Sequence, residues 1–545
     1  MTARRKFWGW GLEGQGATDA EVHTITKVFS NRFGRELVQS SAPRIDEFAL
    51  RQPRLKPPPA LAHFCRQDEH ERLVHSYGKS FPDYVRLFER KVPSPPDVIA
   101  YPENENQVSD VLNWAASVNA AVIPFGGGSS VCGGVECDVG DSYAGVISLD
   151  LARMGKLLEV DRLSRSARIQ AGAFGPALEA QLKPHGLTLR HFPQSFEFST
   201  LGGWIATRSG GHYATLFTHI DDFVQAMRVV TPKGVIETRR LPGSGAGPQP
   251  ERLFIGSEGI LGVITEAWMR VQDAPRFRAS ASIKFTDFLK GAEAARALAQ
   301  SGLFPANCRL IDADEALGTG AGDGRASLLV LGFESADHAQ DTKLARALEL
   351  VRDHGGVMDV PKAASGHEHR EGAAGAWRNA FLRAPYFREV LTPMGVIVDT
   401  FETATTWDRF PAFHAEVKRR MHDVLLRVSG HKGKVTCRFT HVYPDGPAPY
   451  YTFQTLGKPG ALMEQWRTIK AEANDIVVSA GGTITHHHAV GRDHRPGYSR
   501  ECPPLFADAM RAAKKSLDPA GLLNPGVLVD PIDRQVGVRG AMAGY

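Results

Sequence analysis

Long apolar runs are missing from the 545 residues of this sequence. No stretch of about 18 apolar residues occurs, so no segment is expected to cross a membrane as a helix. An apolar signal segment is also missing after Met1, and we therefore expect a cytoplasmic protein. The basic and aromatic stretch RRKFWGWG, residues 4–11, leaves peripheral contact with a membrane open.

Cysteine pairs and charge of one sign are also missing. The six cysteines lie between Cys65 and Cys502 without a CxxC pair or a zinc-type spacing, so no disulfide framework is expected. The formal net charge is only +4 and is spread along the chain. Nothing therefore indicates a nucleic-acid partner.

The composition is that of a globular protein, with 42% hydrophobic and 23% charged residues, and the length calls for at least two domains. We expect an N-terminal extension over residues 1–91 and a cofactor-binding domain over 92–273. A substrate or cap domain is expected over 274–500. A helical segment over 501–545 should return to the first domain.

Hydrophobic spacing indicates an α+β arrangement in residues 92–273. Val108, Val111, Leu112 and Ala115 follow the i, i+3, i+4, i+7 spacing of a helix with one buried face. The stretch AVIPF then reads as a strand. Residues 157–171 read as two short strands, and AMRVVTPKGVIETRR reads as a hairpin that turns at residues 232–234.

Three glycine-rich stretches carry the strongest chemical signal: PFGGGSSVCGG, PQSFEFSTLGGW and FIGSEGILGVIT. Glycines free backbone N–H groups to converge on an anion, so three such loops in one domain suit a dinucleotide better than flexible linkers. By contrast, GWGLEG follows no strand and SYGKS has Leu73 where a P-loop has glycine, so both are discounted. The expected cofactor-binding residues are Pro124, Phe125, Gly126, Gly127, Gly128, Ser129, Ser130, Gly133, Gly134, Pro193, Ser199, Thr200, Gly202, Gly203, Thr207, Gly256, Ser257, Glu258, Gly259, Gly262, Val263 and Ile264.

These loops resemble the FAD-binding domain of the vanillyl-alcohol oxidase group. Together with FETATTWDR, THHHAVG and the C-terminal LDP, they make residues 65–530 similar to the alkyldihydroxyacetonephosphate synthase family. The resemblance implies an α+β fold, with a two-subdomain FAD-binding domain of the vanillyl-alcohol oxidase type and a cap domain built on an antiparallel sheet. It also implies FAD. Residues 125–128 offer no nucleophile, so noncovalent binding is expected, with Cys132 as the alternative attachment point.

The triple histidine in THHHAVG has several interpretations. It lies well inside the chain, unlike a purification tag, and no carboxylate or cysteine nearby in sequence completes a metal site, so no metal is expected. A purely structural role stays open. If GGTITHHHAVG is a strand, His486 and His488 share one side and His487 takes the other. The resemblance instead implies proton transfer beside the flavin by His486, His487 and His488.

The resemblance also implies roles for residues outside this run. Tyr450 matches the catalytic tyrosine, with the adjacent Tyr451 as a competitor and a half-buried strand tyrosine as the alternative. Arg388 and Arg309 match substrate-positioning arginines, for which surface salt bridges are the alternative, and Arg208 is a weaker candidate. An arginine fork suits a carboxylate or phosphate.

The implied reaction replaces the acyl group of 1-acyl-dihydroxyacetone phosphate by a long-chain fatty alcohol, through a flavin N5 adduct and without net redox, and gives an ether-lipid precursor. An apolar tunnel is expected for the chains, and a homodimer is left open. Ala489, where the family has glycine, leaves the shape of the pocket open. The rivals are an FAD-linked dehydrogenase or oxidase of 2-hydroxyacids such as lactate or glycolate, and a non-enzymatic binding module.

Overall fold

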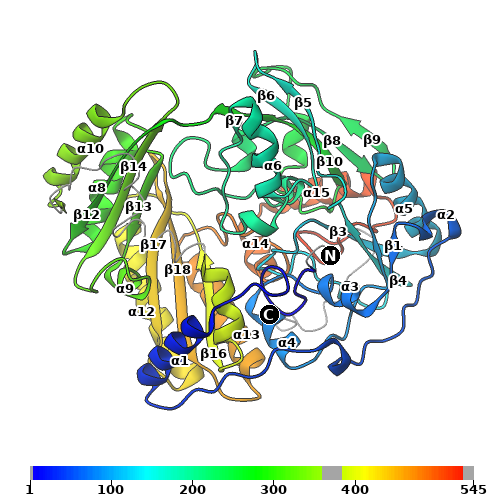
Figure 1. Ribbon diagram of the computed structural model, residues 1–545, viewed down its shortest axis with the longest axis horizontal. Helices are drawn as coiled ribbons and strands as arrows, with labels where there is room; N and C mark the ends of the chain where they lie inside the picture. The colour runs from blue at the N-terminus through cyan, green and yellow to red at the C-terminus, as the bar shows by residue number, and fades with distance from the viewer. Residues whose placement is uncertain (1–3, 359–382, 532–545) are drawn as a thin grey trace.

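The computed structural model describes residues 4–358 and 383–531. Figure 1 shows two halves: one is built from the N-terminal, middle and C-terminal parts of the chain, and the other is a broad sheet with helices on one side. No helix among the described residues is long and apolar enough to span a bilayer. The expected boundaries at residues 91, 273 and 500 stay predictions.

The first half contains a four-stranded sheet with the order β1-β2-β4-β3. The pairs β2–β4 and β3–β4 are parallel, and β1 is antiparallel to β2. The predicted helix is α5 (Glu105–Val118), and Val108, Val111, Leu112 and Ala115 are its buried residues, as expected. The strands are β1 (Cys65–Arg66), β2 (Val98–Ala100), β3 (Ala120–Phe125) and β4 (Gly145–Asp150).

A five-stranded antiparallel sheet, with the order β5-β6-β10-β8-β9, completes this half. It confirms both the short strand pair and the hairpin. Between its strands in sequence lie α6 (Gly175–Leu182), β7 (Leu187–Thr188) and α7 (Leu201–Thr207), and β7 pairs with β11 (Gln272–Asp273), which follows β10. The five strands are β5 (Leu157–Asp161), β6 (Ser166–Gln170), β8 (Val224–Thr231), β9 (Gly234–Glu237) and β10 (Val263–Arg270).

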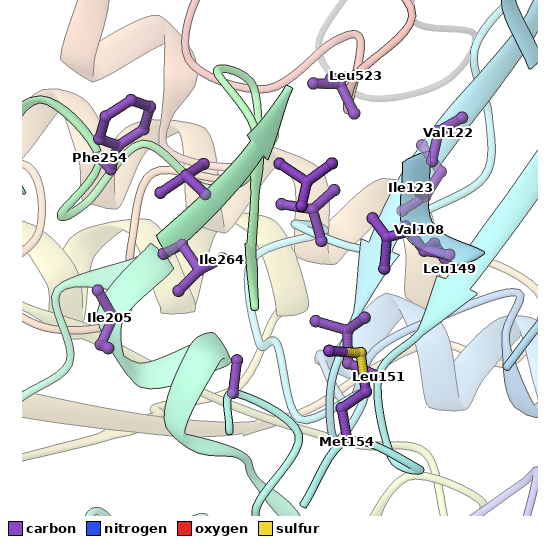
Figure 2. Packing of buried hydrophobic residues seen from close by; sticks show 14 of the residues in the cluster. Val108, Val122, Ile123, Leu149, Leu151, Met154, Ile205, Phe254, Ile264 and Leu523 are labelled. Atoms are coloured by element: carbon purple, nitrogen blue, oxygen red, sulfur yellow. The ribbon is translucent and has the colours of Figure 1, made fainter. Parts of the chain in front are cut away.

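One hydrophobic core joins these two sheets (Figure 2). It includes Val108 and Val122 from the first sheet region, Ile264 from β10, and Leu523 near the C-terminus. The C-terminal segment extends the first sheet, because the N–H of Val122 donates to Leu522 O (2.8 Å) and the N–H of Asn524 donates to Val122 O (2.9 Å). The preceding helices are α14 (Arg495–Glu501) and α15 (Pro504–Leu517).

The second half is a seven-stranded antiparallel sheet with the order β15-β12-β14-β13-β17-β18-β16. Helices α8 (Phe288–Gln300), α10 (Asp341–Asp353), α12 (Phe410–Ser429) and α13 (Leu462–Ser479) pack on one face of it (Figure 1). The short α9 (Ala313–Gly318) follows β13. The strands are β12 (Phe277–Phe285), β13 (Asn307–Ile311), β14 (Ser327–Ser335), β15 (Val357–Met358), β16 (Val396–Glu402), β17 (Lys434–Val442) and β18 (Pro447–Leu456).

The N-terminal segment contacts both halves. Lys6 forms a buried ion pair with Glu389 (2.8 Å), and Trp10 packs edge-on against Phe198. Its first helix packs against residues around β16. The helices of this segment are α1 (Asp19–Phe33), α2 (Pro59–Ala62), α3 (Glu69–Val74) and α4 (Phe81–Phe88).

Leu523 offers a test of how far the C-terminal segment stabilises the first half. Its side chain is 0% exposed within the shared core. We expect Leu523→Ala to lower the free energy of unfolding by about 3 kcal/mol, because the substitution leaves a cavity between the segment and β3. Urea unfolding should show this loss, whereas Leu163→Ala, at a side chain that is 97% exposed, should change stability by less than about 0.5 kcal/mol. Equal losses of unfolding free energy in the two variants would contradict a stabilising role for the C-terminal segment.

Candidate active site

A cavity of about 520 Å³ lies where the glycine loops of the first half face the sheet of the second. Of the expected cofactor-binding residues, Gly133, Gly256 and Ser257 do not line it. Gly133 and Gly256 adopt positive φ values of 73° and 78°, which glycine accommodates without strain. The expected residues that line the cavity are Pro124, Phe125, Gly126, Gly127, Gly128, Ser129, Ser130, Gly134, Pro193, Ser199, Thr200, Gly202, Gly203, Thr207, Glu258, Gly259, Gly262, Val263 and Ile264.

The glycines of the first two loops allow these loops to touch. A Cβ atom at Gly127 would lie 1.7 Å from the carbonyl oxygen of Phe198, and one at Gly126 would lie 2.3 Å from Oγ1 of Thr200. Within the described residues, the five successive N–H groups of residues 126–130 donate to no protein acceptor. This donor set fits the diphosphate of a dinucleotide.

The histidine segment is not a strand, so the predicted alternation of its side chains is wrong. The backbone N–H groups of His486, His487 and His488 all donate to the carboxylate of Glu402, at 2.5, 3.1 and 2.8 Å. Thr485 adds its hydroxyl at 2.6 Å. Three successive N–H groups can reach one carboxylate only if the backbone turns, whereas a pleated strand would point them in alternate directions.

A second carboxylate holds the other end of the segment. The N–H groups of Val490 and Gly491 each donate to Glu258 at 2.8 Å. Burial raises the pKa of Glu258 to about 7, although these two donors act to lower it. Burial would also raise the pKa of Glu402, but the neighbouring histidine rings and the Thr485 hydroxyl hold it well below its usual range.

The three histidines are neutral at pH 7. Burial lowers the pKa of His487 to about 3 and that of His488 to about 4, and it holds the pKa of His486 well below its usual value. The Nδ1 atoms of His486 and His487 lie 3.0 Å apart, so one of them carries the proton and donates it to the other. The pair can therefore hold and pass one proton.

Among the described residues, His441, His486 and His487 form the one group whose spacing could suit a metal ion, with ligand atoms within 4.8 Å of one another. Their nitrogens already hydrogen-bond within the protein. His441 Nε2 donates to Gly211 O (3.0 Å), and His486 Nε2 lies 2.9 Å from the Tyr443 hydroxyl. The expectation of no metal stays a prediction.

Tyr450 and Tyr451 lie on opposite faces of the sheet. Tyr450 lines the cavity, its ring stacks against His487 at 5.9 Å, and the Arg438 guanidinium lies 3.8 Å from the centre of that ring. Tyr451 stacks on Phe401 in the core under the helices. The cavity thus brings Tyr450, and not Tyr451, beside the histidines.

Two of the three candidate arginines line the cavity. Arg309 is 1% exposed there, and burial lowers its pKa to about 9. Arg388 also lines the cavity and pairs with Asp399 at 3.2 Å. Arg208 instead pairs with Asp221 at 3.3 Å, and its side chain is 61% exposed, so the structure does not bring it to the site.

The expected apolar tunnel stays a prediction, because both apolar and polar side chains line the cavity. Side chains of Tyr84, Phe387, Leu391 and Val398 line one part of the cavity. The face of the seven-stranded sheet is instead mostly polar, because the alternate residues of β16, β17 and β18 that line the cavity are polar, apart from Val398. These polar residues are Thr400, Lys434, Thr436, Arg438, Thr440, Tyr450, Thr452 and Gln454.

Comparisons with known proteins identify the family of this chain. A model of an FAD binding domain matches residues 96–239, and a model of the C-terminal domain of FAD linked oxidases matches residues 274–528. Alkyldihydroxyacetonephosphate synthase from Dictyostelium discoideum is 30% identical over 487 residues, which cover 86% of this chain and 79% of that protein. The chain belongs to the alkyldihydroxyacetonephosphate synthase family.

A solved structure from the same family and a curated oxidase are also similar to this chain. A solved structure of an alkyldihydroxyacetonephosphate synthase superposes with a TM-score of 0.78 at 25% identity, covering 96% of this chain and 97% of that one. Glycolate oxidase subunit GlcD from Bacillus subtilis is 25% identical over 466 residues, covering 84% of this chain and 92% of that protein. The predicted family and α+β fold are confirmed.

This family member is an FAD-dependent enzyme, as the sequence predicted. The loop that would hold the diphosphate offers no nucleophile at residues 125–128. Burial raises the pKa of Cys132 well above its usual value, and its thiol donates to His488 O at 3.1 Å. A neutral, hydrogen-bonded thiol is a poor attachment point, which agrees with noncovalent FAD.

The neutral histidines predict a pH dependence of stability. The pKa of an unfolded histidine is about 6.5, above the folded value of His487, so between these values the unfolded chain binds a proton that the folded chain does not. The free energy of unfolding should fall as the pH drops below about 6.5. Urea unfolding at pH 7, 6 and 5 should show that His487→Asn reduces this fall by about 1.4 kcal/mol per pH unit. An unchanged slope would mean that the folded protein protonates His487 readily.

Proposed function

We propose that the enzyme exchanges the acyl group of a 1-acyl-dihydroxyacetone phosphate for a fatty alcohol, giving an alkyl ether and a fatty acid. The observation that carries this proposal is a single cavity joining the glycine loops to Tyr450, the histidine segment and two arginines. The name of the relatives that share the fold supports the substrate pair. No net oxidation occurs, so turnover needs no electron acceptor.

FAD, when bound, supplies an electron sink for the carbon at which the exchange takes place. The protein must then move protons. His487 and His488 are neutral and border the cavity, so each ring offers one nitrogen as a hydrogen-bond donor and one as an acceptor. The Tyr450 hydroxyl, beside His487 in the same cavity, takes or returns a proton at the carbon that carries the acyl group.

The arginines hold the anionic part of the substrate. Arg388 is restrained by Asp399, and one of its other nitrogens donates to the carbonyl of Lys79 (3.4 Å), so its fork is fixed before a substrate arrives. Arg309 presents a second guanidinium to the same cavity. A phosphate bound between planar forks of this kind is positioned as well as neutralised.

The rival is an FAD-linked dehydrogenase or oxidase of small 2-hydroxyacids. The polar face of the sheet favours it, because a hydroxylated acid can hydrogen-bond to threonines that an alkyl chain leaves unpaired. The apolar wall at Phe387, Leu391 and Val398 favours the alkyl chain. Substrate tests must therefore include both classes.

The deciding experiment incubates purified holoenzyme, without oxygen or dye, with 1-palmitoyl-dihydroxyacetone phosphate and hexadecanol. Mass spectrometry should find the hexadecyl ether and one equivalent of palmitate. The absence of ether, together with bleaching of the flavin by lactate or glycolate, would favour the rival.

Tyr450 has a matched control in its neighbour. We expect Tyr450→Phe to lower kcat for ether formation about 100-fold or more, since the variant loses the cavity hydroxyl but keeps the ring. Tyr451→Phe removes a hydroxyl that lies 3.1 Å from His414 Nδ1, away from the cavity, and should keep kcat within about twofold. Reversed effects in steady-state assays of the two variants would assign the role to Tyr451.

A further inference from the structure

The proposed exchange releases one proton per turnover. An alcohol R–OH and an ester R′–CO–O–CH2 give an ether R–O–CH2 and an acid R′–COOH, which ionises near neutral pH to R′–COO⁻ and H⁺. The hydroxyl proton of the alcohol must therefore leave the cavity. His487, which borders the cavity, is one side chain that can receive it, and a hydrogen-bonded path from His487 would carry the proton to solvent independently of the departing acid.

A chain of hydrogen bonds leads from the cavity through the histidine segment. His487 borders the cavity, and its Nδ1 lies 3.0 Å from Nδ1 of His486. Nε2 of His486 lies 2.9 Å from the hydroxyl of Tyr443. Neither His486 nor Tyr443 lines the cavity, so the chain runs outward behind His487.

The path of hydrogen bonds leads to a partly exposed residue. Tyr443 directly follows β17 and is partly exposed, and the next two residues, Pro444 and Asp445, are exposed. Its hydroxyl lies 3.3 Å from Thr218 Oγ1 and 3.4 Å from His219 Nδ1. His219 Nε2 donates to the carbonyl of His486 (3.1 Å), so its Nδ1 is left as an acceptor for the tyrosine.

His486 suits the middle of such a path because both of its ring nitrogens are engaged within it. A proton accepted on Nδ1 from His487 allows the proton on Nε2 to move to Tyr443. As it accepts this proton, Tyr443 donates its own to the Thr218 hydroxyl or to Nδ1 of His219. Burial raises the pKa of Tyr443, so the phenol stays protonated between transfers.

We propose that Tyr443 is the outer end of a hydrogen-bonded path that carries one proton per turnover from His487, through His486, to the protein surface. The source of that proton rests on the proposed function, whereas the path itself rests on the contacts of these three residues. The two can therefore fail separately, and two measurements distinguish them.

The first measurement needs no substrate. In holoenzyme labelled with ¹⁵N-histidine and transferred to D₂O, nuclear magnetic resonance follows the ring proton shared by His486 and His487, identified by its loss in His487→Asn. Exchange of this proton should be at least about tenfold slower in Tyr443→Phe, which cannot relay, than in the wild type. In Tyr213→Phe it should be unchanged, because that hydroxyl donates to Glu334, outside the path. Equal exchange in Tyr443→Phe and the wild type overturns the path.

The second measurement is ether formation. Tyr443→Phe should lower kcat by about 10- to 100-fold with FAD still bound, and added imidazole buffer should restore part of the rate by carrying the proton instead. A purely structural role for Tyr443 would give a loss that imidazole does not repair, and that outcome also overturns the proposal. If ring-proton exchange is slower in Tyr443→Phe but the wild-type enzyme forms no ether, the path is supported and the proposed reaction is rejected.

Discussion

The active site depends on the carboxylate of Glu402, which accepts hydrogen bonds from the backbone of three successive histidines. Removing a carboxylate from water is costly unless donors replace the lost hydration. Here the donors are backbone N–H groups that no sheet or helix could satisfy at this turn. The same contacts therefore compensate the buried charge and fix the direction of three imidazole rings.

Glu402 lies on β16 of the seven-stranded sheet, and Glu258 lies in a loop of the first half. Each carboxylate holds one end of residues 485–491. The histidine segment thus connects the two halves across the cavity. Because Glu402 on β16 pairs directly with Tyr450 on β18, the pairing of these two strands positions the carboxylate and the tyrosine together. Proton-handling groups from distant parts of the sequence are thereby placed within reach of one another.

The sequence predicted the elements whose signals are local. The spacing of Val108 to Ala115 and the glycine loops were sufficient for α5 and for most of the cavity lining. The prediction of a strand for the histidine segment was wrong because Glu402, which is distant in sequence, sets the conformation of this segment. Tyr443, His219 and His441 carried no local signal, since they meet His486 only after β17 and the loop before β8 have packed. The prediction that Arg208 belongs to the site was wrong because Asp221, thirteen residues later, pairs with it.

Hydrogen–deuterium exchange of the backbone amides in residues 485–491 tests the central constraint most directly. The segment has no regular secondary structure, so a free loop would exchange in seconds. If the two carboxylates hold it, the amides of His486, His487, His488, Val490 and Gly491 should be as protected as those of β16 and β18, and Glu402→Gln should release the first three. Rapid exchange of all five in the wild type would contradict the account.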